Sequence, residues 1–224
     1  MGIQLIVVLC LGVLLLCALM AYQTKWYGIS PWKSVPIACA LVATGVIGSE
    51  IWFCVENGFW GGRSLYGAIV FSPIVFLFVA KILRIKYAEI LDFVAPGGCL
   101  VLALVKIQCL RDHCCEGMVL YIDENHMYVR FPSQIVEMAT FLIISALLFY
   151  MSSKSKYRGK IFPWFLVIYG VARFCLDFLR ETIPSYLFGL SAGAFWSLCS
   201  FVVGLVILIA GWAKEKRSEE LSVG

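Results

Sequence analysis

The chain has 224 residues, of which 62% are hydrophobic and only 14% are charged, and its mean hydropathy is +0.91. A soluble domain of this composition would have too few polar residues to cover so much apolar surface, so the sequence predicts an integral membrane protein. The formal net charge of +4 is small and does not indicate a nucleic-acid-binding protein, so the expected surroundings are a lipid bilayer.

Seven stretches are apolar and close to the length of about 20 residues that one helical membrane crossing needs. In chain order they are 3–22, 33–55, 66–83, 88–107, 134–152, 161–180 and 190–212. The longest connection between them is 108–133. We therefore expect an all-α, polytopic membrane protein, with a single domain of about seven transmembrane helices over 1–213 and a charged tail over 214–224.

Lysine and arginine indicate how these helices cross the membrane. Twelve of the 18 basic residues lie in the connections after the first, third and fifth stretches and in the C-terminal tail. Segments rich in Lys and Arg stay on the cytoplasmic side of a membrane. The sequence therefore predicts that the N-terminus is outside, that the C-terminal tail is cytoplasmic and that the connection 108–133 is outside.

Glycine and proline mark two places along these stretches. The segment Gly61–Gly67 (GGRSLYG) predicts a close turn between the second and third helices, and Tyr66 by itself is typical of an aromatic residue at the membrane interface. Pro96, followed by Gly97 and Gly98, predicts a break or kink in the fourth helix. Such a break would expose backbone groups that a cavity can use.

Three ionisable residues lie within or at the end of the predicted sixth helix. Arg173, Asp177 and Arg180 are spaced i, i+4 and i+7, which places them on one face of an α-helix. A charge at membrane depth is costly unless it is paired or faces a polar cavity. Two arginines around one acid leave one positive charge, which predicts a site for an anionic group such as a lipid phosphate or a charged solute. The alternative is an ion pair that only fixes helix packing.

A cluster of metal-ligand residue types lies in the long outer connection. Its members are Cys109, His113, Cys114 and Cys115. Cys and His together suggest zinc, but adjacent cysteines rarely bind one ion and no second pair completes a site, so we expect no metal. A disulfide in this loop, with Cys54 or Cys99 as a possible partner, stays open because the outer side is oxidising in many cells.

Six segments, taken in order over about residues 56–195, resemble the prolipoprotein diacylglyceryl transferase family. They are GGRSLYG, LDFVAP, a basic residue followed by CLRDHCCEG, FPSQIVE, YGVARFCLDFLR and GLSAG. The resemblance implies an enzyme without a cofactor in the plasma (inner) membrane of a bacterium. Its implied reaction transfers a diacylglyceryl group from phosphatidylglycerol to the thiol of the lipobox cysteine in a prolipoprotein signal peptide.

The resemblance also implies which residues form the site. The expected catalytic residues are Tyr66, Lys106 and Arg173. The residues expected to bind substrate are Arg180, Asp177, Gln134, Glu137, Asp112 and Ser191. In the implied chemistry, the cations neutralise the departing phosphate, while Tyr66 donates a hydrogen bond or acts as a base. Asp177, Glu137 and Gln134 would orient these groups.

The chain departs from the family pattern at five positions. The family has arginine where Lys106 stands, asparagine at Asp112 and glutamine at Ala194; histidine is common at Tyr66, and glutamate stands at Asp177. Lysine keeps the charge of arginine but loses its bidentate fork. Two alternatives therefore stay open: an inactive or substrate-shifted paralogue, and a transporter or lipid-binding protein on a similar helix scaffold.

Overall fold

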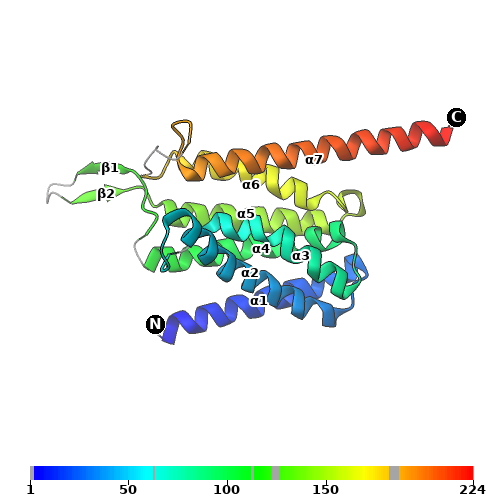
Figure 1. The fold of residues 1–224 in the computed structure, drawn as a ribbon. Coiled ribbons are helices and arrows are strands. Elements are labelled where there is room, and N and C mark those ends of the chain that lie inside the picture. Colours follow the sequence, from blue (N-terminus) through cyan, green and yellow to red (C-terminus); the bar gives the residue numbers. More distant parts are fainter. Residues whose placement is uncertain (1–2, 63, 112–113, 123–126, 182–186, 224) are drawn as a thin grey trace. The chain divides into compact units, whose positions relative to one another are not determined.

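The computed structural model describes residues 3–62, 64–111, 114–122, 127–181 and 187–223. Within them lie seven α-helices, one short 3₁₀ helix at Ser155–Tyr157 and one β-hairpin (Figure 1). The helices are α1 (Ile3–Tyr27), α2 (Pro31–Asn57), α3 (Leu65–Leu83), α4 (Tyr87–Arg111), α5 (Ser133–Ser152), α6 (Ile161–Asp177) and α7 (Ala192–Val223). The expectation of a mostly helical protein is confirmed.

Five of these helices are long and apolar enough to cross a membrane, judged by length and composition over the described residues. They are α2, α3, α4, α5 and α7. The other two, α1 and α6, coincide with the first and sixth predicted stretches, and α6 has only 17 residues. Helix α7 continues through the charged residues that follow the last apolar stretch, as far as Val223.

The chain forms two compact units. The first contains Met1–Leu104 and Ser145–Ile161, and the second contains Val105–Ile144 and Phe162–Gly224. Helices α4 and α5 therefore contribute residues to both units. In the first unit α2 packs against both α1 and α3. A Cβ added to Gly67 of α3 would overlap the carbonyl oxygen of Gly48 in α2, so this contact requires glycine.

The predicted break at Pro96 does not occur, because α4 continues as one helix from Tyr87 to Arg111, while the alternative of a kink stays a prediction. Proline lacks the N–H that would continue the helical hydrogen bonds. The hydroxyl of Ser145 in α5 donates a hydrogen bond to the carbonyl oxygen of Pro96 at 2.8 Å. This bond ties α5 to the turn of α4 that contains Pro96.

The second unit contains a hairpin that the all-α prediction missed. Strands β1 (Val119–Ile122) and β2 (Tyr128–Arg130) pair antiparallel, with Ile122 opposite Tyr128 (Figure 1). β-Branched and aromatic residues are common in both strands, and such residues favour extended backbone. The strands are too short to be found by a search for helices of membrane-spanning length. The connection 108–133 therefore contains regular structure that the sequence analysis did not predict.

Candidate functional site

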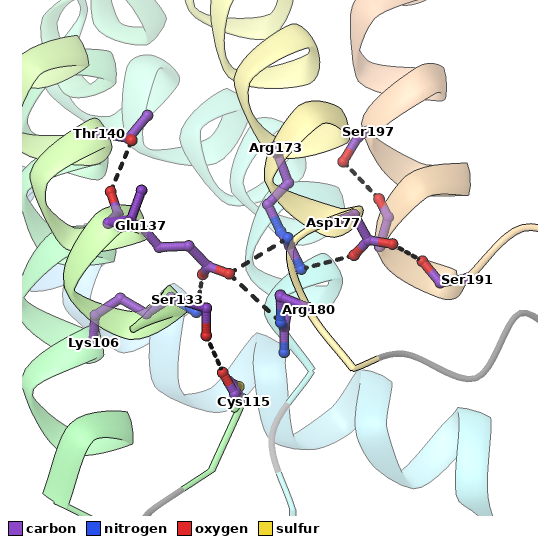
Figure 2. A network of polar contacts seen from close by, with 12 residues as sticks. Lys106, Cys115, Ser133, Glu137, Thr140, Arg173, Asp177, Arg180, Ser191 and Ser197 are labelled. Carbon is purple, nitrogen blue, oxygen red and sulfur yellow. Dashed lines mark hydrogen bonds and ion pairs between the residues drawn. The ribbon is translucent and has the colours of Figure 1, made fainter. Parts of the chain in front are cut away.

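Three cations of the second unit meet at one carboxylate (Figure 2). Glu137 lies in the second turn of α5, and only 1% of its surface is exposed. The Nζ atom of Lys106, from the last part of α4, contacts Glu137 Oε2. Arg173 Nη1 and Arg180 Nε lie 3.6 Å and 3.5 Å from Glu137 Oε1. Glu137 is therefore the centre of the cluster, and three different chain segments supply its partners.

A second carboxylate ties the cluster to the start of α7. Arg173 Nη2 lies 3.4 Å from Asp177 Oδ1, one helical turn further along α6. The other oxygen of Asp177 accepts a hydrogen bond from the hydroxyl of Ser191. Ser191 Oγ in turn accepts from the backbone N–H of Ala194 at 3.0 Å, which is the bond of an N-cap residue. The cap of α7 thus fixes the carboxylate that faces Arg173 (Figure 2).

Gly193 makes this close approach possible. A Cβ added there would overlap Asp177 Oδ1 and lie 3.1 Å from Arg173 Nη2. We expect Gly193→Ala to displace Asp177 and to destabilise the protein by about 1–3 kcal/mol, the usual cost of overpacking a filled site. Thermal unfolding in detergent measures this. The matched control is Gly211→Ala in the same helix, where a Cβ meets nothing within 4 Å. Equal unfolding temperatures for the two variants would contradict the crowded contact.

The charges of this cluster do not cancel. Lys106, Arg173 and Arg180 are three cations, whereas Glu137 and Asp177 are two carboxylates, so these five residues carry one surplus positive charge. Lys106, Arg173 and Asp177 are 8%, 4% and 5% exposed. Buried charges need partners, and the three arginine contacts of 3.4–3.6 Å are longer than ordinary hydrogen bonds. An anion with several oxygens suits such a set of donors.

Arg180 belongs to the cluster, but it does not lie on the helix where it was predicted. Helix α6 ends at Asp177, so Arg180 is not the third member of a helical stripe. It lies in the segment after the helix, which pairs with the connection between α4 and α5 through an isolated bridge between Arg180 and Gly117. The backbone N–H of Met118 donates to Leu179 O at 3.1 Å. The connection between α4 and α5 therefore positions this arginine.

The first residues of α5 hold the same connection. Gln134 Nε2 donates to the carbonyl oxygen of Cys114 at 2.9 Å, and Ser133 Oγ donates to that of Cys115 at 2.7 Å. Gln134 was expected to orient substrate groups, and in the structure its side-chain amide anchors this loop. Ser133 was not predicted. Its position directly after Pro132 at the start of a helix was the available clue, because serine is common at helix starts.

Two predicted site residues do not belong to the described part of the second unit. Tyr66 is half-buried in the first turn of α3, in the first unit, so its role stays a prediction. Asp112 lies outside the described residues. The site therefore unites Lys106, Glu137 and the arginines in the second unit, while the proposed acid–base residue belongs to the first.

Cys109, Cys114 and Cys115 are free thiols, as are Cys54 and Cys99, so the described residues contain no disulfide in this loop. The sulfur atoms of Cys109, Cys114 and Cys115 all lie within 4.8 Å of one another. A hydrogen bond from the Cys109 thiol, together with the positive charges of Arg180 and Lys106, lowers the pKa of the Cys115 thiol below its usual value. The thiols therefore adjoin the charged cluster.

Comparisons with known proteins bear on this site. The family model described as prolipoprotein diacylglyceryl transferase matches residues 5–210. Three similar proteins all carry the name phosphatidylglycerol–prolipoprotein diacylglyceryl transferase. The protein from Bordetella avium is 31% identical over 170 residues, which are 70% of this chain and 64% of the relative. The protein from Teredinibacter turnerae is 28% identical over 171 residues, 71% of this chain and 60% of the relative.

The third relative, from Clostridium tetani, is 22% identical over 219 residues and is covered more fully, with 88% of both chains aligned. The chain thus spans under two thirds of two of these relatives and most of the third. The family match covers the great majority of the sequence and includes every residue of the buried charged cluster. The chain therefore belongs to the prolipoprotein diacylglyceryl transferase family.

Proposed function

We propose that this protein transfers a diacylglyceryl group from phosphatidylglycerol to the thiol of a lipobox cysteine in a prolipoprotein signal peptide. The reaction takes place at the outer leaflet of the bacterial plasma membrane. Membership of the family and the names of the relatives support the reaction class. The observation that carries the proposal is the buried cluster with its surplus positive charge, because the reaction needs a site for a lipid phosphate.

The chemistry makes specific demands on such a site. The acceptor sulfur forms a bond to the terminal carbon of the diacylglyceryl group, the bond from that carbon to the phosphate oxygen breaks, and glycerol phosphate leaves. Negative charge grows on the departing phosphate, so preorganised donors lower the barrier. Arg173 and Arg180 offer forked donors and Lys106 a single charged one. The acceptor thiol must also lose its proton, and Tyr66 is the candidate base or hydrogen-bond donor.

The direct test is transfer by the purified protein in lipid nanodiscs. Phosphatidylglycerol labelled in its acyl chains should pass its label to a lipobox peptide, and a peptide with serine in place of the cysteine should stay unlabelled. Phosphatidylcholine labelled in the same way should not pass its label to the peptide. Labelling of a peptide by a different lipid would indicate a substrate-shifted paralogue. If no lipid tested labels the peptide, the transferase proposal is wrong.

Lys106 stands at a position where the family has arginine. Substitutions of Lys106 therefore test whether this side chain binds the lipid phosphate. Lys106→Ala should abolish transfer, whereas Lys106→Arg should retain or raise it, because a guanidinium binds phosphate through two donors. The control is Lys86→Ala, whose ammonium is exposed and pairs with Glu89 at 3.5 Å; it should leave the rate unchanged. A full transfer rate in Lys106→Ala would remove Lys106 from the phosphate site.

We also propose a topology of seven membrane spans, with the N-terminus outside and the C-terminal tail in the cytoplasm. The distribution of basic residues supports this orientation. Reporter fusions after residues within 153–160 and 214–224 should be cytoplasmic, and a fusion within 111–131 should be outside. A cytoplasmic location for 111–131 would contradict both the orientation and the placement of the reaction at the outer leaflet.

A further inference from the structure

Three sulfur atoms gather where the outer connection leaves α4. Cys109 lies in the last turn of α4, and Cys114 and Cys115 lie in the connection that leads to β1. Their Sγ atoms are all within 4.8 Å of one another, although two of the residues are adjacent in sequence. Cys115 has a φ of 59°, which is rare for a residue with a side chain. This local reversal of the backbone lets neighbouring cysteines share one group of sulfur atoms.

The surroundings hold this segment in place without help from a disulfide. The carbonyl oxygens of Cys114 and Cys115 accept hydrogen bonds from Gln134 and Ser133, at the start of α5. The backbone N–H of Cys114 donates to the carbonyl oxygen of Cys109 at 3.2 Å. Both ends of the sulfur group are therefore fixed to helices. Such support from neighbouring hydrogen bonds is what a metal site needs to orient its ligands.

The dimensions and the charge suit a thiophilic cation. A zinc–sulfur bond is about 2.3 Å long, so sulfur atoms that share one zinc ion lie roughly 4 Å apart. The observed separations, within 4.8 Å, need only small movements to reach that arrangement. Three thiolates around a divalent ion would carry one negative charge, and the connection that holds two of them pairs with the cation Arg180 through Gly117. A disulfide would use two of the three sulfurs and leave the third without a role.

We propose that Cys109, Cys114 and Cys115 form a three-thiolate site for a thiophilic cation of the Zn²⁺ class. The described residues supply three ligands, which leaves a fourth position for water or an added thiol. Bound metal would fasten the outer connection to the end of α4. Because Gly117 of that connection pairs with Arg180, the metal would also steady the arginine of the charged cluster. The site does not depend on the transfer activity and is tested without it.

The test uses the full chain, reduced with a phosphine and freed of metal by a chelator. Titration with Cd²⁺ as the probe should give one ion per chain and an ultraviolet thiolate-to-metal charge-transfer band. Cys109→Ser, Cys114→Ser and Cys115→Ser should each weaken Cd²⁺ binding. Loss of a residue that only supports a metal ligand costs roughly 10–100-fold in metal affinity, and loss of a ligand should cost at least as much. The matched control is Cys175→Ser, an exposed cysteine of α6 outside the group, which should bind Cd²⁺ like the unmodified protein.

A second measurement separates lost binding from lost folding. Zn²⁺ should raise the unfolding temperature of the unmodified protein and of Cys175→Ser, because a ligand of the folded state stabilises it. It should not raise that of Cys115→Ser, whose metal-free form should unfold at the same temperature as metal-free unmodified protein. The proposal is overturned if the reduced protein binds no Cd²⁺, or if any of the three cysteine variants binds it unchanged. It is also overturned if the purified protein carries a Cys109–Cys115 disulfide that excludes metal.

Discussion

Glu137→Gln should destabilise the protein strongly, by about 3–5 kcal/mol, which is the usual cost of removing one partner from a buried ion pair. Glu137 is nearly inaccessible and contacts Lys106, Arg173 and Arg180. Glutamine keeps the size of the side chain but leaves the two buried cations and the partly exposed Arg180 with Asp177 as the remaining carboxylate among the described cluster residues. Thermal unfolding in detergent should therefore shift to a clearly lower temperature.

The matched control is Glu116→Gln in the same unit. Glu116 also pairs with an arginine, at 3.0 Å from Arg130, but its side chain is 39% exposed. Exposed ion pairs contribute about 0–1 kcal/mol, so this variant should unfold close to the unmodified protein. Adding Lys106→Met to Glu137→Gln removes one of the stranded cations and should regain part of the stability. If Glu137→Gln unfolds like Glu116→Gln, Glu137 does not hold the cluster together.

Local sequence features predict the helices of this protein well. The stretches 66–83 and 134–152 differ by one residue from α3 (Leu65–Leu83) and α5 (Ser133–Ser152), because the length of an apolar run is a property of the sequence itself. The Arg173–Asp177 ion pair was predictable for the same reason. Its spacing of four residues places both side chains on one face of a single helix.

The parts that failed all depend on contacts between distant segments. Glu137 was assigned a supporting role, and nothing in its neighbourhood in the sequence shows that three cations from other segments meet there. Arg180 was placed on the helix because its spacing fits, whereas the chain leaves the helix at Asp177 and pairs with Gly117. The cysteine cluster was recognised but no metal was expected there, because the sequence does not show the unusual backbone at Cys115 or the close approach of the three sulfur atoms.

Arg173→Gln should lower the rate of diacylglyceryl transfer by about a hundredfold or more, the range seen when one preorganised donor to a developing anion is removed. Arg173 is 4% exposed and bridges the two carboxylates, with Nη1 toward Glu137 and Nη2 toward Asp177. Glutamine cannot supply the charge or the fork that a phosphate needs. The variant also leaves Asp177 without its cation, so some loss of stability should accompany the loss of activity.

A double variant separates these two effects. Arg173→Gln with Asp177→Asn removes both charges of the pair, and the introduced asparagine keeps the size of the aspartate and an oxygen that can accept from Ser191. The control double variant is Lys86→Gln with Glu89→Gln, a solvent-accessible lysine–glutamate pair at 3.5 Å near the start of α4 that should keep both stability and transfer near the unmodified values.

The decisive measurement is the transfer rate from phosphatidylglycerol to a lipobox peptide for the Arg173→Gln, Asp177→Asn double variant, taken together with its unfolding temperature. If Arg173 binds the lipid phosphate, the double variant should recover the stability that Arg173→Gln loses and still transfer about a hundredfold more slowly than the unmodified protein. Recovery of both stability and transfer would contradict the phosphate-binding role and leave Arg173 as a residue that only pairs with Asp177.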